Sequence, residues 1–411
     1  MKDERHDPNM IVKIAGELLS EGAGGQVRLR VSKVILTWGS VIVRCRVESA
    51  PADLPADLIV KKVREDRCGY DPDSPVAPNA AHWLFNDWAA AQFLGGISHD
   101  PPLSPEFYGG SRELGLVVLE DLGEGEAPTT ADALQGSDSA LTEQTLVEHA
   151  SLIGQLHAMT LGRAEQYRRI RLSLGPAPQF EKLYQDPWSD ARLCPVRPAE
   201  VDEAIRLYHA GFEALGLRPR HGVEEEIAFV TRAVEEDPGP FLAYCKGDQS
   251  GAGDYIRCSG KLRLFDFNAG GLRHALIEGM PGRMTWGCMM RIPRRVVSLM
   301  ERSYQTRLAE VYAGAADDRL FRRCMAEAGA RWNIFHVIHR LPDALENDRQ
   351  RGPTTLRQQT LAWIEAFAEL SEEVGQMEAL GESAREMAER LRKLWPADVS
   401  RLPYYPAFAL P

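Results

Sequence analysis

The character of the sequence changes about one third of the way along the chain, and this change limits the folds that it can adopt. The first part contains short runs of β-branched residues, partly alternating and bounded by turn signals, which are typical of β-strands. One stretch within it, 80–94, instead has apolar residues at helical spacing. The predicted strands are 33–36, 41–47, 58–60, 107–108 and 116–119.

The rest of the chain is predicted to be mainly helical. Apolar residues recur at helical spacing over 141–159, and most of 293–395 has the same character. Only two short strands are expected there, over 241–245 and 262–267. We therefore expect an α+β protein whose β-rich part covers residues 1–121 and whose larger helical part covers residues 122–411.

The composition excludes several classes of protein. Of the 411 residues, 44% are hydrophobic and 26% are charged, as in ordinary globular chains. A formal net charge of −11 argues against a nucleic-acid partner and is more compatible with cationic ligands. No stretch approaches the roughly 18 apolar residues of a membrane span, and the N-terminus lacks the apolar core of a signal peptide. The seven cysteines are scattered, which favours a reducing compartment over a disulfide framework. We therefore expect a cytoplasmic protein, and because no membrane span is found we expect no membrane partner.

The most informative segment for chemistry contains Asp248 and Asp266, each at the end of a short apolar strand. A glycine-rich loop lies between them, and glycines allow the backbone to approach a nucleotide closely. Phosphoryl transfer uses one carboxylate to accept the proton of the attacking hydroxyl and further oxygens to hold magnesium. The same pattern alone would also suit two hairpin turns with solvated aspartates.

Five segments that follow one another along the chain together carry a family resemblance, and the segment with Asp248 and Asp266 is the last of them. The five are LIVK (58–61), FNDWAAAQFL (85–94), LVVLEDLG (116–123), IGQLHA (153–158) and GD with DF (247–248 and 266–267). This series resembles the aminoglycoside phosphotransferase and choline kinase group of the protein-kinase-like superfamily, over roughly residues 30–290. The resemblance implies a protein-kinase-like two-lobed fold, with ATP and Mg²⁺ as cofactors.

The resemblance also implies catalytic roles. Asp248 would be the general base that orients the substrate hydroxyl, and Asp266 would be a magnesium ligand. Lys61 would pair with the α- and β-phosphates, with Asp87 orienting it through an ion pair. Lys62 stays an alternative, because a shift of one residue in the strand register exchanges the lysine that faces inward.

Two other parts of the resemblance concern nucleotide binding. Gly39 and Ser40 would form the turn over the phosphates. Glu120, Asp121 and Leu122 would form the hinge, where backbone groups bind the adenine.

Three positions depart from the family's pattern. Lys246 stands where the family has a histidine before Gly-Asp, and Gly253 replaces the asparagine that is the second metal ligand. Asp254, one residue later, could take over as a metal ligand, because carboxylates bind magnesium well. Asp87 is one methylene shorter than the family's glutamate and has to approach Lys61 more closely. These departures suit either a diverged enzyme or a silent nucleotide binder.

Three other features are expected to be structural. His157 is predicted to be a packed or hydrogen-bonded core residue. His336 and His339 share a helical face but have no neighbouring carboxylate motif, which favours a core or surface role over a metal site. The methionine-rich segment 279–294 is predicted to pack against the helical part, although it could also form the floor of an acceptor pocket.

We therefore expect an ATP- and magnesium-dependent phosphotransferase that acts on the hydroxyl of a small molecule. The acidic balance favours a cationic acceptor, such as an amino sugar or an amino alcohol. Two alternatives stay open. One is a catalytically silent nucleotide-binding pseudokinase, and the other is a kinase that acts on the hydroxyls of a peptide or protein.

Overall fold

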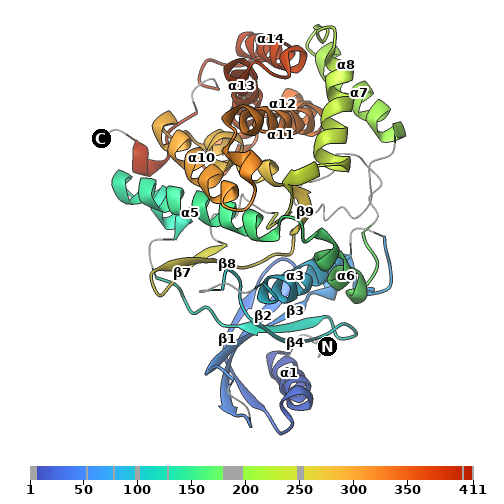
Figure 1. Ribbon diagram of the computed structural model, residues 1–411, viewed down its shortest axis with the longest axis vertical. Coiled ribbons are helices and arrows are strands. Elements are labelled where there is room, and N and C mark those ends of the chain that lie inside the picture. Colours follow the sequence, from blue (N-terminus) through green and yellow to red (C-terminus); the bar gives the residue numbers. More distant parts are fainter. Residues whose placement is uncertain are drawn as a thin grey trace.

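The computed structural model of this chain divides visibly into a sheet lobe and a helical lobe. Figure 1 shows the sheet and its covering helices at one end and the C-terminal helices gathered at the other. The structure describes residues 7–51, 54–76, 79–97, 102–126, 129–178, 198–247, 254–399 and 402–409.

The sheet lobe is built on five antiparallel strands in the order β1-β2-β3-β5-β4. The strands are β1 (Arg28–Leu36), β2 (Ser40–Ser49), β3 (Asp57–Val63), β4 (Phe107–Ser111) and β5 (Leu116–Glu120). Three helices accompany them, α1 (Pro8–Ala23), α2 (Glu65–Cys68) and α3 (Ala80–Gly95). The predicted strands of this region and the predicted helix at 80–94 are confirmed.

Both faces of the sheet are covered. Leu58 and Val60 of β3 pack with α1 in one apolar cluster, whereas Val63 belongs to the cluster that contains α3. Because successive side chains of a strand point to opposite faces, Lys61 lies on the α3 side and Lys62 on the α1 side. Helix α1, which the sequence analysis did not predict, therefore fixes which lysine faces α3.

The helical lobe consists of packed helices with three short strand pairs. Its helices are α4 (Thr130–Gln135), α5 (Ser139–Thr160), α6 (Ala164–Leu174), α7 (Pro198–Glu213), α8 (Val223–Val230), α9 (Trp286–Met289), α10 (Arg294–Ala309), α11 (Asp318–His339), α12 (Leu341–Glu346), α13 (Leu356–Val374) and α14 (Glu378–Leu394). The pairs are β6 (Leu242–Cys245) with β9 (Gly271–His274), β7 (Tyr255–Cys258) with β8 (Lys261–Leu264), and β10 (Gln350–Arg351) with β11 (Thr354–Thr355).

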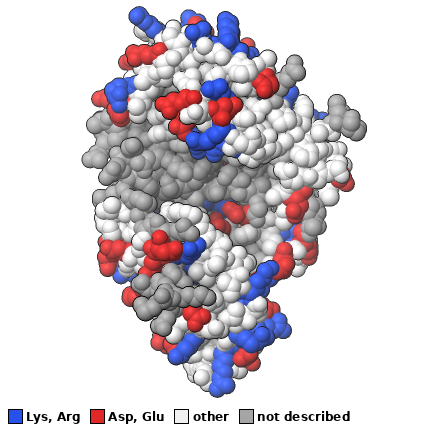
Figure 2. All heavy atoms as spheres, turned by 180° about the vertical axis from the view of Figure 1, so that it is seen from behind, with Lys and Arg blue, Asp and Glu red and all other residues white. Residues whose placement is uncertain are grey.

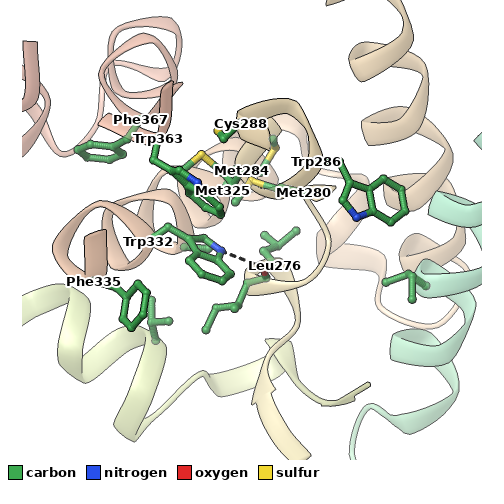
Figure 3. Packing of buried hydrophobic residues seen from close by; sticks show 14 of the residues in the cluster. Leu276, Met280, Met284, Trp286, Cys288, Met325, Trp332, Phe335, Trp363 and Phe367 are labelled. Atoms are coloured by element: carbon green, nitrogen blue, oxygen red, sulfur yellow. Dashed lines mark hydrogen bonds between the residues drawn. The ribbon is translucent and has the colours of Figure 1, made fainter. Parts of the chain in front are cut away.

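Helix α11 forms the centre of this lobe. Every residue from 324 to 338 is buried, so the helix is enclosed on all sides rather than along one stripe. Figure 3 shows Trp332 and Phe335 of α11 packed near Trp363 of α13. The methionine-rich segment supplies Met280, Met284 and Cys288 to the same cluster, as predicted.

The predicted α+β class and the division into a small β-rich part and a larger helical part are confirmed. The boundary between residues 121 and 122 stays a prediction. Within the described residues, no helix combines the length and the apolar character needed to cross a bilayer.

Candidate functional site

Three charged side chains from separate elements meet at the junction of the two lobes. Lys61 Nζ, on β3, lies 2.6 Å from Asp87 Oδ2, on α3, and 2.7 Å from Asp266 Oδ1, just after β8. Asp266 follows Lys61 by 205 positions in the sequence, so only the fold brings them together. The structure thus brings together the lysine and two of the aspartates that the family resemblance singled out.

Helix α3 holds the segment that carries Asp266. Asp87 Oδ1 accepts a hydrogen bond from the backbone N–H of Phe267 at 2.9 Å. The neighbouring Asn86 donates its side-chain amide to the carbonyl oxygen of Asn268, also at 2.9 Å. Arg171 in turn donates to the Asn86 amide oxygen, which fixes the orientation of that side chain. Asp87 therefore orients both the lysine and the backbone beside Asp266.

The charges stabilise one another despite their burial. Burial alone would lower the pKa of Lys61, but the charges of Asp266 and Asp87 and their hydrogen bonds raise it above its ordinary value. Burial favours a raised pKa for Asp266, yet the charge of Lys61 and its hydrogen bond hold that pKa below its ordinary value. The lysine is therefore protonated and Asp266 is ionised at neutral pH.

The backbone at Asp266 is strained. Its φ is +58°, a left-handed conformation that residues other than glycine seldom adopt. Such conformations cluster at functional sites, where the surrounding structure holds them. Here the adjacent bonds from Asp87 and Asn86 hold the segment, and the Asp266 side chain keeps 35% of its surface exposed.

Lys62 has a different environment. Its Nζ donates to Glu65 Oε1 at 2.9 Å, three residues along the chain. Of the two alternatives that the sequence left open, Lys61 is the lysine that faces Asp87 and Asp266.

The predicted catalytic loop is described only at its two ends. Asp248 and Gly253 lie outside the described residues. At the N-terminal end of the loop, the backbone N–H of Lys246 donates to Glu278 Oε2 at 2.9 Å and that of Gly247 donates to Glu278 Oε1 at 2.8 Å. A carboxylate that accepts two successive amides fixes the direction in which the chain leaves towards Asp248.

Gly247 is required at its position. Its φ of +101° is strained for any side chain, and an added Cβ would lie 2.1 Å from the carbonyl oxygen of Ala269. The chain before the predicted catalytic aspartate can therefore take this course only with glycine.

His157 completes the support of Glu278. Its Nε2 lies 3.0 Å from Glu278 Oε2, and its Nδ1 lies 2.8 Å from the Tyr304 hydroxyl. Burial would raise the pKa of Glu278, but the hydrogen bond and charge of His157 and the Gly247 amide lower it to about 2. The prediction that His157 is a hydrogen-bonded core residue is confirmed.

Lys246 and Asp254 join the two ends of the loop. Lys246 Nζ lies 2.9 Å from Asp254 Oδ2, and the lysine side chain is fully buried. The carbonyl oxygen of Asp254 also accepts from the backbone N–H of Phe265 at 3.2 Å. Lys246, which stands where the resembled family has a histidine, therefore forms an ion pair with the residue at the other end of the loop.

The donor groups near the junction suit magnesium. Asp254 and Asp266 both offer carboxylate oxygens, the hard ligands that this ion prefers, and both side chains are partly exposed, by 24% and 35%. Each also has a lysine partner, so a bound ion would compete with Lys246 for Asp254 and with Lys61 for Asp266.

Two other groups of potential metal ligands occur among the described residues, both fully buried. One consists of His157, Cys245 and Glu278, whose carboxylate is already used to hold the backbone of the loop. Burial, with the charge of Glu278, raises the pKa of Cys245 well above its ordinary value, which keeps the thiol protonated. The other group is His274, Cys324 and Glu327.

The carboxylates of the predicted hinge form ion pairs between elements. Glu120 pairs with both terminal nitrogens of Arg263, on β8, at 2.8 Å. Asp121 lies 2.5 Å from Arg44 Nε on β2, and the Leu122 carbonyl accepts from the Cys258 thiol. The Glu120–Arg263 pair and the bond from Cys258 to the Leu122 carbonyl connect the sheet lobe to the helical lobe, whereas Asp121 and Arg44 both belong to the sheet lobe.

Gly39 and Ser40 lie in the tight turn between β1 and β2. The Ser40 carbonyl accepts from the backbone N–H of Thr37, and the Gly39 carbonyl accepts from that of Arg64, both at 2.9 Å. Ser40 is paired with Val63, two residues beyond Lys61 on β3. The turn is therefore at the same end of the sheet as Lys61.

The sequence analysis missed Glu278, Tyr304 and Arg263. Glu278 follows Lys246 by 32 positions, and Arg263 follows Glu120 by 143. No local motif marks these residues, because their partners are defined only by the folded chain.

No family model matches this sequence, and no curated protein matches it. Solved structures do match over most of both chains. An amicoumacin kinase, hAmiN, in complex with AMP-PNP, Ca²⁺ and Ami is 12% identical, with 96% of this chain and 100% of that one covered and a TM-score of 0.45. A choline kinase from Cryptosporidium parvum Iowa II is 11% identical, with 97% and 99% covered and a TM-score of 0.43.

A choline/ethanolamine kinase family protein from Mesorhizobium loti is 13% identical, with 92% and 100% covered and a TM-score of 0.39. At these identities and TM-scores the likeness does not establish what this protein does. These three are among the solved structures that the chain is similar to.

Proposed function

We propose that this protein is an ATP- and magnesium-dependent phosphotransferase that phosphorylates a hydroxyl group of a small molecule. The observation that carries the proposal is the convergence of Lys61, Asp87 and Asp266 from a strand, a helix and a separate loop. Phosphoryl transfer depends mainly on positioning and on electrostatic stabilisation, which is what such a group of fixed charges supplies.

Lys61 is the proposed phosphate-binding residue. Its ammonium is kept protonated by two carboxylates, so it can donate hydrogen bonds to phosphate oxygens. Asp87 is the proposed positioning residue, since it contacts both Lys61 and the amide of Phe267. The contact of Lys61 with Asp87 lies within the sheet lobe, and the contacts with Asp266 and Phe267 reach the helical lobe.

Asp266 and Asp254 are the proposed magnesium ligands. Magnesium held by these carboxylates would neutralise the charge of the nucleotide's phosphates. The strained backbone at Asp266 turns its carboxylate towards Lys61, and the Lys246 pair directs the carboxylate of Asp254 back towards the start of the loop.

Asp248 is the proposed general base, and Glu278 its indirect support. In this role Asp248 accepts the proton of the acceptor hydroxyl as that oxygen attacks the terminal phosphate. Glu278 holds the two amides that precede Asp248, which limits the positions open to the base. Gly39, Ser40 and the backbone of Glu120 to Leu122 are the proposed nucleotide contacts.

The proposed acceptor is a small molecule, with a cationic amino sugar or amino alcohol favoured by the net charge of −11. The face in Figure 2 is hollowed between the two lobes, and acidic and basic side chains are interspersed around the hollow. A peptide hydroxyl is the remaining acceptor class, and it would need a more extended groove than a small molecule.

A silent nucleotide binder is the second candidate function. The ion pair between Lys246 and Asp254 favours it, because Asp254 is neutralised by a lysine that is not itself a proposed phosphate-binding residue. The active enzyme is preferred because Asp266 keeps an exposed carboxylate next to a protonated lysine.

Turnover of magnesium-ATP with a panel of hydroxyl compounds tests the proposal. Amino sugars, amino alcohols, neutral sugars and a serine peptide would be compared for the wild type, Asp266→Asn and Asp254→Asn. We expect phosphate transfer to at least one small hydroxyl compound, with a loss of at least about 100-fold in Asp266→Asn. Transfer that survives Asp266→Asn unchanged would refute the mechanism. Nucleotide binding without transfer to any compound would favour the silent binder.

A further inference from the structure

A small cavity within the helical lobe has the properties of a binding site. It is partly open, has a volume of about 80 Å³ and lies between α11, α13 and the segment around α9. Figure 3 shows Trp332, Phe335 and Trp363, which form its aromatic walls. Its lining is made of Thr285, Met289, Trp332, Phe335, His336, Arg340, Arg351, Leu356, Gln359, Thr360 and Trp363.

Two buried polar side chains of the lining lack partners. Among the described residues, neither ring nitrogen of His336 has a hydrogen-bond partner, and the same holds for the Thr360 hydroxyl. His336 is 5% exposed and Thr360 is 1% exposed. Because a buried polar group without a partner costs about 1–3 kcal/mol, several such groups around one cavity indicate that its contents complete their bonds.

The charge of the lining has one sign. Arg340 and Arg351 both border the cavity, and none of the described residues that line it is acidic. The charge of Asp343 acts on Arg351. Asp343 itself accepts a hydrogen bond from Arg349 at 3.0 Å. Two arginine residues therefore belong to the lining, and their positive charge favours an anion there.

His336 can contribute a neutral donor. Burial, together with the charges of Arg340 and Arg331, lowers the pKa of His336 well below its ordinary value. A neutral imidazole has one N–H donor and one acceptor nitrogen. Its ring lies 3.8 Å from that of Trp363, between centroids, so packing against the tryptophan limits its orientation.

We propose that this cavity binds a small anion, with Arg340 and Arg351 supplying the charge and His336 and Thr360 the buried hydrogen bonds. One water molecule needs at least about 10–15 Å³ of such cavity volume, so a cavity of about 80 Å³ has room for a group of several heavy atoms such as one phosphate or carboxylate. The aromatic walls would contact the remainder of a short organic acid. The ligand class differs from the cationic acceptor proposed above, and the inference does not depend on that proposal.

The cavity wall is close in sequence to the support of the catalytic loop. Trp332 donates its indole N–H to the carbonyl oxygen of Ile277 at 3.0 Å. The next residue, Glu278, holds the amides of Lys246 and Gly247. An anion bound in the cavity would therefore contact a side chain that is attached to the same short segment as the loop.

Titration of histidine-labelled protein with three probes tests the site. Inorganic phosphate, acetate and benzoate would each be added while the His336 ring signal, assigned with His336→Gln, is followed by nuclear magnetic resonance. We expect the signal to move with saturation for at least one probe and the affinity to fall at least about 10-fold in Arg351→Gln. Arg385→Gln is the control, because Arg385 pairs with Glu372 and neither residue lines the cavity.

The probes also separate the two chemistries. Saturation by phosphate alone would assign a phosphate group, and saturation by acetate or benzoate alone would assign a carboxylate. Phosphate bound near Lys61 would leave the His336 signal unchanged, so the local readout keeps the two sites apart. A signal unmoved by all three probes, or moved equally in Arg351→Gln, would refute the proposal and indicate a cavity that holds only water.

Discussion

Replacement of Glu278 by glutamine is the sharpest perturbation of the loop that precedes Asp248. In the folded protein the carboxylate accepts from the amides of Lys246 and Gly247 and contacts His157. Glutamine has the same shape but only one accepting oxygen. Its NH₂ group would face one of the two amides as a second donor, and that amide would lose its bond.

The magnitude follows from the pKa of Glu278. Burial opposes ionisation, but the bond and charge of His157 and the Gly247 amide lower the pKa from 4.5 to about 2. At about 1.4 kcal/mol for each tenfold change, this corresponds to roughly 3 kcal/mol of stability at pH 7. Because the folded-state pKa is the lower one, this contribution is complete above about pH 4.5 and is lost as the pH falls towards 2.

Urea unfolding at pH 7 and at pH 3 measures this contribution. We expect Glu278→Gln to be roughly 3 kcal/mol less stable than the wild type at pH 7, and only roughly 1 kcal/mol less stable at pH 3. Glu327→Gln is the control. Burial, only partly offset by Arg323, raises the pKa of Glu327, so its neutralisation should cost no stability.

Two results would refute this reasoning. One is a Glu278→Gln variant as stable as the wild type at pH 7. The other is a difference that stays constant between pH 7 and pH 3, because a hydrogen bond that does not depend on ionisation would give that result.

Three further substitutions test single contacts by the free energy of unfolding. Gly247→Ala should lose at least about 2 kcal/mol, because its Cβ would meet the carbonyl oxygen of Ala269, and an unchanged midpoint would contradict that close approach. Arg263→Gln should lose about 1–3 kcal/mol by leaving Glu120 without its bidentate partner, and its effect should be smaller in Glu120→Gln protein, where the bond of Arg263 to the Ser104 carbonyl is what is left to lose. Trp332→Phe should lose about 1–3 kcal/mol, because it removes a buried hydrogen bond. Trp38→Phe is its control at an exposed site, and a smaller loss in Trp332→Phe than in this control would contradict the prediction.

Much of the sheet lobe could be predicted because its signals are local. The β-branched runs in β2, β3 and β5 and the apolar spacing of α3 depend on neighbouring residues alone. The choice between Lys61 and Lys62 could not be made in this way, since both are buried, at 9% and 5% exposure. It depends on α1, which covers the opposite face of the sheet and which the sequence analysis did not predict.

Only those residues of the candidate site that belong to family motifs could be predicted from the sequence. Lys61, Asp87 and Asp266 were named from the motifs, and the fold brings them into contact. Glu278 and Arg263 were not named, because each acts on a residue far away in the sequence and belongs to no recognisable pattern. The role of Asp248 stays a prediction.

Calorimetric titration with magnesium and a non-hydrolysable ATP analogue tests the central claim most directly. The claim is that Lys61, with Asp87 and Asp266, forms the phosphate-binding end of a nucleotide site. We expect the wild type to bind, Lys61→Met to lose at least about 10-fold in affinity, and Lys62→Met to match the wild type, once circular dichroism has established that each variant is folded. Equal affinities for all three proteins, or no binding by the wild type, would contradict the claim.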